Sequence, residues 1–337
     1  MKAADLGVQK SLDRFQTAWL THALYASIQL DVPDAIDDRP VTADDLAKKL
    51  NADPSALYRL MRALAANGYF QESSEGFFSH NDASRQLRRD SASGMRSMLE
   101  LSGMDSMQRA WGQLGKSLKS DKGAFELANG APLFTYLAKN GEDAKSFNEA
   151  MAAVTSLHAR DALEGYPGFK SAKRILDIAG GLGHMLGHIL NHCPQAEGSV
   201  YDLPELESPS REFLSQKGLG ARTGFIAGSF LESIPDGFDL LMIKNALWNW
   251  SDSDCVKILR NVRRAIASST TRLLIIENLI SNEDLARSTL MDLQMLVAPN
   301  GRCRTAAEYT SLVKESELCV HKIYNVVSTQ IVECVAT

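Results

Sequence analysis

A short apolar run followed at once by three closely spaced glycines constrains this chain more than any other stretch. The run Ile175–Ile178 is too short for a helix and stops at glycines, which is typical of a strand buried on both faces. Apolar residues then recur at helical spacing from Met185 to Leu190. The glycines of the turn are Gly180, Gly181 and Gly183. They let the backbone approach a ligand, and the next helix begins with free N–H groups. The pattern therefore predicts a nucleotide or nucleoside site, although a plain strand-to-helix connection has the same pattern.

An acidic residue ends the next predicted strand. Asp202 follows the glycine turn by about twenty residues, the usual spacing in nucleotide-binding folds. A carboxylate at the carboxyl end of such a strand can accept hydrogen bonds from both hydroxyls of a ribose. Folds that bind dinucleotides and folds that bind nucleoside sulfonium compounds share this feature, so the rest of the chain has to distinguish them.

Length and composition set the broad class. The 337 residues are enough for two domains, and 45% hydrophobic residues are enough for ordinary cores. A net charge of −5 argues against nucleic acid as the main partner. The five cysteines are scattered without CxxC spacing, which indicates reduced thiols. The sequence has neither the apolar core of a signal peptide nor a membrane-spanning run. We therefore expect a cytoplasmic protein that binds no membrane.

The N-terminal third reads as helical with a winged helix-turn-helix. Up to about residue 36, apolar side chains that include Trp19 recur at helical spacing, as in either an internal core or a dimer interface. Thr42 and Asp53 are placed to cap two helices, with Pro54 at the first position of the second helix. Two short aromatic strands then read as the wing. A structural role is favoured over operator binding, because the second helix offers few cations and the protein is acidic.

The remaining segments suggest a helical region followed by an α/β domain. Residues 84–165 are mostly helical, and a stripe on the last helix forms either core or a pocket wall: Phe147, Met151, Val154 and His158. From about residue 171, strands alternate with helices, and two adjacent strands near the C-terminus suggest an antiparallel hairpin on a mostly parallel sheet. Three histidines after the glycine turn, His184, His188 and His192, share a helix face. Their spacing could hold a metal, but a solvated polar face is the plainer reading, and we predict no metal site.

Taken in order, these signals resemble the plant and microbial small-molecule O-methyltransferases of the caffeic-acid type, which use S-adenosylmethionine (SAM). The resemblance covers nearly all of the chain. It is carried by the winged-helix front end and by segments 147–151, 177–183, 201–204, 228–230, 244–252, 255–259, 291–296 and 301–305, with Glu277. It implies a class I SAM-dependent methyltransferase domain, Rossmann-like, at 171–337. Residues 1–100 would form a mainly α-helical winged-helix dimerisation domain, and residues 101–170 a helical linker that contributes to the substrate pocket. A homodimer through the N-terminal domain is expected.

The resemblance assigns a cofactor site that is changed but complete. The three glycines of the turn would line the methionine and ribose portions of SAM, or of its product S-adenosylhomocysteine (SAH). Asp202 would take the ribose hydroxyls, with Leu203 beside it. Phe230 would lie against adenine, and Ser229 stands where the family usually has an acid. Lys244 would reach the methionine end. Ala179 replaces the first glycine of the usual turn, and we expect it to have an unstrained φ.

The resemblance also predicts that the reacting centre is altered. Trp248 stands where the family has the histidine that removes the proton from the substrate hydroxyl, and an indole cannot act as a base at neutral pH. Of the two family glutamates beside that histidine, one is retained as Glu277 and the other is replaced by Cys303. Glu277 would orient the substrate or accept a proton, unless it is a structural carboxylate. Cys303 is either a nucleophile or, more simply, a packing thiol.

Three functions remain open on the sequence. The first is methyl transfer by proximity to a small aromatic or heteroaromatic metabolite with an N-, C- or acidic O-nucleophile. The second is a non-methylating reaction that uses bound SAM, such as a pericyclic rearrangement, a decarboxylation or a hydroxylation; Trp248 would then be a wall or an N–H donor. The third is a winged-helix regulatory protein. The substrate pocket implied by the resemblance is flat and largely apolar: Trp111, Phe147, Met151, Met295, Ala298 and Asn300.

Overall fold

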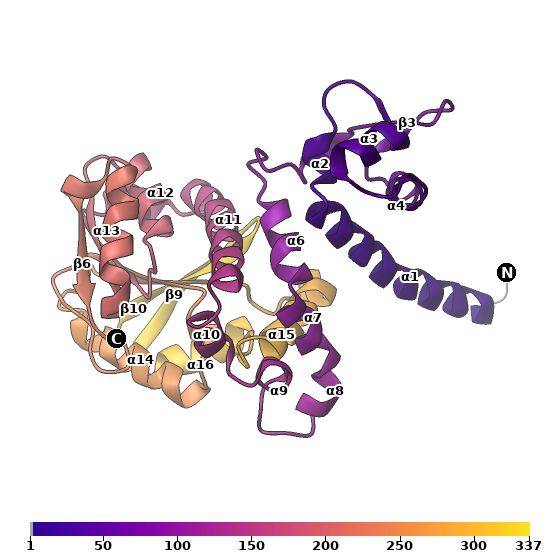
Figure 1. Ribbon diagram of the computed structural model, residues 1–337. Coiled ribbons are helices and arrows are strands. Elements are labelled where there is room, and N and C mark those ends of the chain that lie inside the picture. Colours follow the sequence, from indigo (N-terminus) through magenta and orange to yellow (C-terminus); the bar gives the residue numbers. More distant parts are fainter. Residues whose placement is uncertain (1–2) are drawn as a thin grey trace. The chain divides into compact units, whose positions relative to one another are not determined.

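The structure is a computed structural model that describes residues 3–337 (Figure 1). The chain divides into two units, one formed by the residues up to Gln108 together with Leu137–Ala153, the other by Arg109–Tyr136 and Val154–Thr337. The long helix α11 (Gly141–Gly165) contributes its first half to one unit and its second half to the other. The three-part functional division at residues 100 and 170 stays a prediction.

The first unit contains the expected winged helix. Its three-stranded antiparallel sheet has the order β1-β3-β2. The elements are α1 (Ala3–Gln29), α2 (Val32–Ala35), β1 (Val41–Thr42), α3 (Ala43–Leu50), α4 (Pro54–Ala66), β2 (Gln71–Glu72), β3 (Phe77–Ser79), α5 (Asp82–Arg85) and α6 (Met95–Gly103). Both predicted caps are confirmed, since the side chain of Thr42 accepts from the Asp45 N–H and that of Asp53 from the Ala56 N–H. The first helical segment is interrupted at Asp31, whose φ is 58°.

One side of α1 remains exposed in the single chain. Leu24 and Ile28 near its end are buried against the winged helix. Four large apolar side chains nearer its beginning are between 47% and 62% exposed: Val8, Leu12, Phe15 and Trp19. They recur at helical spacing and so form one stripe. This stripe is not part of the core of its own chain, which favours the dimer-interface reading.

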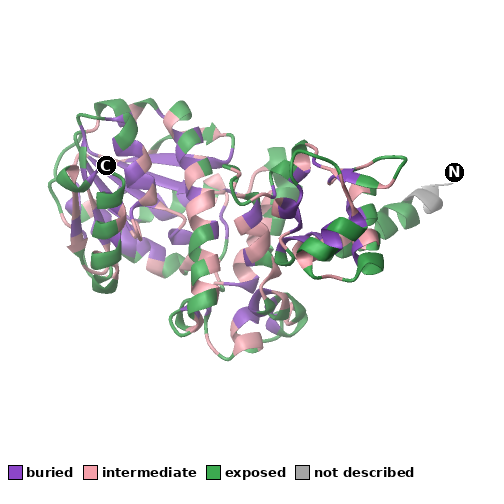
Figure 2. Cartoon of the chain, turned by 45° about the horizontal axis from the view of Figure 1, so that its top comes forward, coloured by how far each residue is buried: buried purple, intermediate pink, exposed green. Residues whose placement is uncertain are grey.

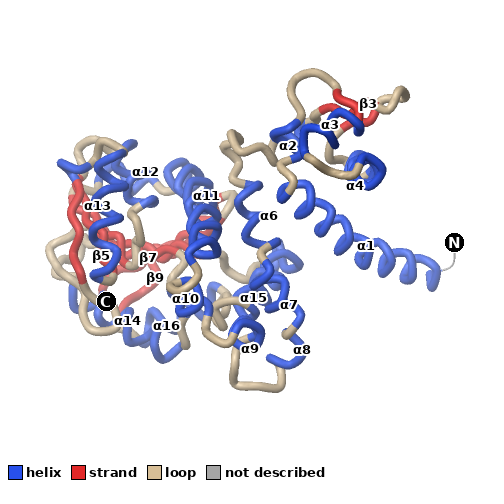
Figure 3. Tube along the Cα trace, viewed as in Figure 1, coloured by secondary structure: helices blue, strands red, loops and turns tan. Residues whose placement is uncertain are grey.

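The second unit is built on a seven-stranded sheet with the order β6-β5-β4-β7-β8-β10-β9 (Figure 3). The pairs among β4 to β8 are parallel, and β10 runs antiparallel to both β8 and β9, as the predicted C-terminal hairpin requires. The strands are β4 (Arg174–Ile178), β5 (Glu197–Asp202), β6 (Thr223–Ala227), β7 (Leu240–Lys244), β8 (Arg272–Glu277), β9 (Leu318–Val326) and β10 (Thr329–Ala336). Its helices are α8 (Leu114–Ser117), α9 (Ala124–Asn129), α12 (His184–His192), α13 (Glu207–Gln216), α14 (Asp252–Ala265), α15 (Leu285–Val297) and α16 (Ala306–Glu315). Two more helices, α7 (Asp105–Gly112) and α10 (Leu133–Leu137), are divided between the units after Gln108 and before Leu137.

The central strands of this sheet are mostly buried, as the purple strands in Figure 2 show, and their side chains belong to two separate core clusters. Leu176 and Ile178 of β4 pack with residues of α14 and α16, whereas Ile175 packs with residues of α12 on the opposite face. Continuous apolar runs are expected for strands covered twice. The strand order reverses at β4, which lies between β5 and β7, and ligands of such sheets bind at this reversal, beyond the carboxyl ends of the strands. Among the residues that the structure describes, no helix is long and apolar enough to span a bilayer.

The turn after β4 differs from the expectation in one respect. Ala179 has a φ of 56°, so the expected unstrained conformation is wrong. Gly181 and Gly183 also have positive φ, at 59° and 84°. A left-handed conformation costs an L-residue with a Cβ roughly 1–2 kcal/mol. The Ala179 N–H nevertheless donates to the Tyr201 carbonyl at 2.8 Å, which ties the strained residue to the end of β5.

We expect Ala179→Gly to raise the free energy of unfolding by roughly 0.5 kcal/mol, because the relieved strain exceeds the extra unfolded-state entropy of glycine. Urea denaturation measures the change. Ala63→Gly, at an exposed position inside α4, is the matched control and should lower the free energy of unfolding by about 1 kcal/mol. A loss of stability of similar size at both positions would contradict the assignment of strain to Ala179.

Candidate functional site

Each glycine of the turn is favoured for a physical reason, either lack of space or a positive φ. A Cβ on Gly180 would lie 2.7 Å from the Asp177 carboxyl carbon, and one on Gly183 would lie 2.9 Å from a methyl group of Val200. A Cβ on Gly181 would meet no atom within 4 Å, so there the positive φ rather than space favours glycine. Open space beside the backbone at this point is what a ligand that approaches the main chain requires.

Asp202 lies beside the turn, as its spacing predicts. Its Oδ2 accepts from the Gly181 N–H at 2.8 Å, and its Oδ1 accepts from the Leu203 N–H at 2.7 Å. Burial raises the pKa of Asp202, and the two N–H donors oppose that shift. The Gly228 N–H donates to the Asp202 carbonyl, so the segment that carries Ser229 and Phe230 begins next to this carboxylate.

Phe230 packs against a second aromatic side chain, Trp250. The rings of Phe230 and Trp250 pack edge to face, with centroids 5.6 Å apart and planes at 83°. Both side chains are half-buried. A flat heteroaromatic group such as adenine can pack against an apolar surface of this kind. Trp250 therefore joins the candidate cofactor residues, and its signal in the sequence was an aromatic residue within segment 244–252.

Enclosed polar atoms without partners mark the other end of the cradle. Asp177 is 1% exposed, and burial raises its pKa to about 7. The Asp177 Oδ2 and the Asn245 Oδ1 are enclosed and accept no hydrogen bond within the described residues. Burial lowers the pKa of Lys244 to about 8, and its Nζ donates to the Thr155 hydroxyl at 3.0 Å. Buried polar groups are normally paired, so these atoms suit a ligand with an ammonium and a carboxylate, as the methionine end of SAM has.

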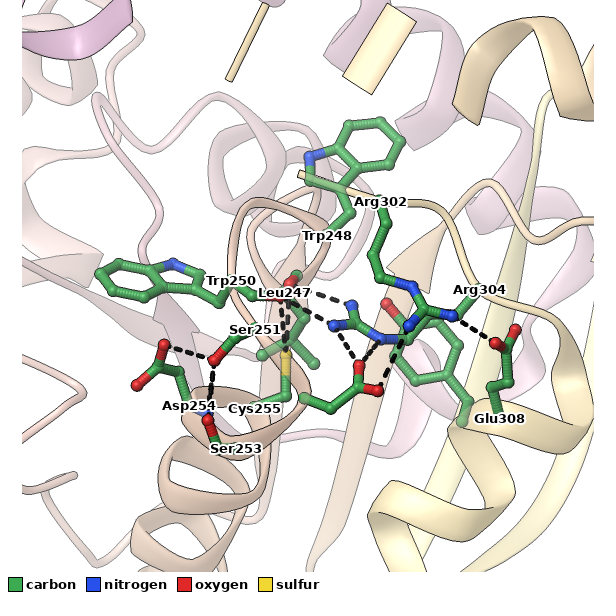
Figure 4. Close-up of polar contacts among 12 residues, drawn as sticks. Leu247, Trp248, Trp250, Ser251, Ser253, Asp254, Cys255, Arg302, Arg304 and Glu308 are labelled. Carbon is green, nitrogen blue, oxygen red and sulfur yellow. Dashed lines mark hydrogen bonds and ion pairs between the residues drawn. The ribbon is translucent and has the colours of Figure 1, made fainter. Parts of the chain in front are cut away.

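The structure brings the three predicted reaction-centre positions close together, and Figure 4 shows the surroundings of one of them, Trp248. Trp248 lies in a short 3-10 turn, Leu247–Asn249, that follows β7. Its main-chain N–H donates to the Glu277 Oε1 at 3.1 Å, and its carbonyl accepts from the Arg302 N–H at 2.8 Å. Cys303 follows Arg302 in the chain. The main chain around the indole is thus fixed from two sides.

Glu277 is fully engaged by its own chain. It ends β8 and is 1% exposed, and its Oε2 accepts from the hydroxyl of buried Tyr309. Burial raises the pKa of Glu277 despite the donors around it. Because each carboxylate oxygen already has a donor, the contacts favour the structural alternative. Tyr309 was not identified from the sequence, since nothing local to α16 indicates its partner on β8.

A second buried charge holds the same segment. The guanidinium of Arg304 is enclosed and donates to the carbonyls of Leu247 and Trp250, at 3.2 and 2.8 Å. It also donates twice to the Asp252 carboxylate, at 2.9 and 2.7 Å. Figure 4 shows these contacts converging on one side of the segment. In the sequence, Arg304 is recognisable only as part of segment 301–305, and nothing near it indicates its partners.

Cys303 has the environment of a packing thiol. It is 3% exposed, and burial raises the pKa of its thiol to about 12. The thiol is therefore protonated at neutral pH, and a protonated thiol is a poor nucleophile. The main-chain N–H of Cys303 donates to the Asp292 Oδ1 at 2.7 Å.

The predicted substrate residues fall in both units. Trp111 donates from Nε1 to the Gln294 Oε1 at 3.0 Å, beside Met295 on α15. Ala298 and Asn300 follow this helix, and a Cβ on Gly123 would lie 2.8 Å from the Asn300 Cβ. These residues belong to the second unit, whereas Phe147 and Met151 lie half-buried on the half of α11 in the first unit. Their common role stays a prediction.

The three histidines of α12 have separate surroundings. The ring of His184 packs on Phe213 at 4.1 Å, and burial lowers its pKa to about 4. His188 pairs with the Ser156 hydroxyl at 3.1 Å, and His192 pairs with the His188 carbonyl at 3.0 Å. Across residues 3–337, no three or more His, Cys, Asp or Glu side chains are grouped so that they could hold a metal ion.

Comparisons with known proteins agree with this geometry. Residues 111–317 match a family model described as an O-methyltransferase domain, and residues 12–90 match an O-methyltransferase dimerisation domain. Mitomycin biosynthesis 6-O-methyltransferase of Streptomyces lavendulae is 32% identical, over 92% of this chain and 88% of that protein. The 8-amino-8-demethylriboflavin N,N-dimethyltransferase of Streptomyces davaonensis is 32% identical, over 86% and 84%. The structure of CalO1, a methyltransferase in calicheamicin biosynthesis in its SAH-bound form, superposes with a TM-score of 0.88 at 26% identity, covering all of both chains.

Removal of the Tyr309 hydroxyl should expose the structural role of Glu277. Tyr309→Phe leaves the Glu277 Oε2 buried without a donor, so we expect the free energy of unfolding to fall by about 1–3 kcal/mol. Tyr324→Phe is the matched control, because its hydroxyl also donates to a buried glutamate, Glu333, but from a side chain that is only partly buried. It should cost less than about 1 kcal/mol. Equal losses in urea denaturation would contradict a special role for the Tyr309 contact.

Proposed function

The chain belongs to the O-methyltransferase family and is a SAM-dependent methyltransferase, and we propose that it methylates a small aromatic or heteroaromatic metabolite without a general base. The observation that carries the proposal is the indole of Trp248, fixed where the resemblance places a base, next to a glutamate whose oxygens are both occupied. The relatives named above support the substrate class, because one is an O-methyltransferase of mitomycin biosynthesis and the other is an N,N-dimethyltransferase of 8-amino-8-demethylriboflavin.

The contacts at the ends of β4, β5 and β7 support the cofactor assignment. The open backbone at Gly181 and the neighbouring carboxylate of Asp202 suit a ribose. Phe230 and Trp250 offer apolar surface for adenine. The unpartnered Asp177 oxygen and the Lys244 ammonium suit the amino and carboxylate groups of the methionine portion. These residues would hold SAM, and its bound sulfonium supplies a methyl group that is already electrophilic.

A nucleophile that arrives ionised or neutral with a free lone pair needs placement rather than deprotonation. General-base assistance contributes roughly a hundred- to ten-thousand-fold, whereas alignment of the reacting atoms contributes as much or more. The residues at the reacting centre are suited to alignment. The main chain at Trp248 is fixed. At neutral pH, neither the indole of Trp248 nor the protonated thiol of Cys303 can accept a proton from the substrate. The pH dependence of the reaction then reports the substrate.

A methyl-transfer assay tests the proposal. Incubation of the protein and SAM with ring nitrogen heterocycles and phenols of graded acidity should yield SAH and methylated product. Below each phenol's own pKa, the rate should rise about tenfold per pH unit, because only the ionised fraction reacts. Product formed without consumption of SAM would instead indicate a non-methylating enzyme.

The matched variant in that assay is Trp248→His. A histidine alone should not restore methylation of weakly acidic phenols, because Cys303 stands where the second family glutamate would lie and Glu277 is held by Tyr309. Robust activity of this single variant on a catechol would contradict the proposal.

Cofactor affinity should depend on pH through Lys244. Burial lowers the pKa of this amine to about 8, so its positive charge is present below pH 8 and is lost above it. We expect SAH affinity, measured by calorimetry, to fall by up to about tenfold per pH unit above 8. Lys244→Met should bind SAH more weakly and without this component; the ligand's own amino group titrates in both proteins. Parallel pH profiles for the two proteins would contradict the role of Lys244.

The assembly and location of the enzyme are also proposals. The match to a dimerisation domain supports a homodimer, and the exposed apolar stripe of α1 offers a surface for it. The acidic net charge supports a partner other than nucleic acid. A cytoplasmic location remains a prediction from the scattered cysteines.

A further inference from the structure

The indole nitrogen of Trp248 is a hydrogen-bond donor with no acceptor in the part of the chain that the structure describes. The residue is only 8% exposed, but its Nε1 atom is not fully enclosed. A ligand can therefore reach this N–H. The Trp111 Nε1, by contrast, is paired with Gln294. Figure 4 shows the Trp248 ring pointing away from the cluster around Arg304, so none of those acceptors serves it.

The main chain that carries the Trp248 ring is held in place by hydrogen bonds on both sides of the residue. Its N–H is held by Glu277, and its carbonyl is held by the Arg302 N–H. The carbonyl also packs against Gly301 so closely that a Cβ there would lie 2.1 Å from the oxygen. Because the side chain is also largely buried, it has little room to rotate, and the donor is presented within a narrow region, as pre-organised recognition groups are.

The neighbouring groups leave this donor uncontested. Both oxygens of Glu277 are occupied, and the Cys303 thiol is buried and neutral. The Arg302 guanidinium is paired with Asp252 and Glu308, and the Arg304 guanidinium with Asp252 and two carbonyls. A ligand at the reacting centre therefore meets one unsatisfied N–H and no competing carboxylate from these residues.

We propose that the Trp248 N–H is a specificity-determining donor, and that the substrate is a planar aromatic molecule that presents to it an anionic oxygen, a carbonyl or an unprotonated ring nitrogen. This inference rests on the proposed function, which it deepens by naming the substrate chemistry. A substrate without an acceptor leaves the donor desolvated and unpaired, which corresponds to a loss of roughly 10- to 100-fold in affinity or kcat/KM.

Matched ring systems measure the preference directly. The 5- and 8-hydroxyquinolines have the shape of 1-naphthol, and the 6- and 7-hydroxyquinolines that of 2-naphthol, but each adds one ring nitrogen at a different place. Binding of all six to the SAH-loaded protein is measured by calorimetry with EDTA present, and SAH formation is measured with SAM. We expect at least one hydroxyquinoline to bind about tenfold or more tightly than its naphthol.

The decisive variant is Trp248→Phe, which keeps an aromatic ring and removes the N–H. It should lose the preference by weakening the favoured hydroxyquinoline about tenfold while binding the naphthol as before. Trp248→His retains an N–H donor and should recover part of the preference. Trp250→Phe, two residues away, should keep the preference and weaken SAH instead, because Trp250 packs with Phe230. The melting temperature of each variant shows that it is folded, and the two Trp248 variants should also bind SAH as the wild type does.

The outcomes separate the two proposals. Three outcomes would overturn the inference. The wild type could bind hydroxyquinolines and naphthols equally well, it could bind none of the six compounds, or Trp248→Phe could keep the wild-type preference for a hydroxyquinoline. Methylation of hydroxyquinolines and naphthols at equal rates would overturn the inference alone. A preference in binding that Trp248 controls, without any SAH formation from SAM, would support the inference and count against methyl transfer.

Discussion

Two buried charged side chains, Glu277 and Arg304, hold the segment after β7, and the geometry of the reacting centre depends on them. A buried charge costs several kcal/mol unless it is paired and hydrogen-bonded. Glu277 accepts from the Trp248 N–H and the Tyr309 hydroxyl, and Arg304 donates to two carbonyls and to Asp252. The Tyr309 hydroxyl and the Asp252 carboxylate are side-chain partners. The other three contacts are to the main chain of the segment. The segment therefore keeps its shape whichever side chain stands at position 248.

The cofactor half of the site depends on a different constraint, which is local strain at the ends of two adjacent strands. Ala179 follows β4 and Asn245 follows β7, and both have positive φ, at 56° and 51°. Asp177 and Asn245 also carry the unpartnered oxygens at this edge. Strain and unsatisfied polar atoms both lower stability, and they concentrate at functional sites where a bound ligand compensates for them. The two halves of the candidate site therefore differ: polar oxygens at the proposed cofactor half lack partners, whereas Glu277, Arg302 and Arg304 beside Trp248 are each paired.

The sequence predicted what depends on near neighbours in the chain. The apolar run of β4, the caps at Thr42 and Asp53 and the C-terminal hairpin all follow from local pattern, and the structure contains each of them. The pairing of the glycine turn with Asp202 followed from strand spacing. The contacts of the reacting centre could not be predicted, because Tyr309 lies 32 residues from Glu277 and Arg304 lies 52 residues from Asp252. The φ of Ala179 was also missed, since tertiary contacts rather than residue type impose it.

The replacement of the family's histidine by Trp248 removes a base and adds an N–H donor. It is consistent with methyl transfer when the rate contribution of a general base is compared with the gain from a more acidic substrate. A simple phenol with a pKa near 10 is ionised to roughly one part in a thousand at pH 7, and a general base contributes about a hundred- to ten-thousand-fold. A substrate whose hydroxyl ionises near pH 7 or below recovers a factor of the same size by itself. An N–H donor beside the resulting oxyanion favours the charged form further, because hydrogen bonds to an anion lower its pKa. The protein then has to provide only position and one donor, and both are present at Trp248.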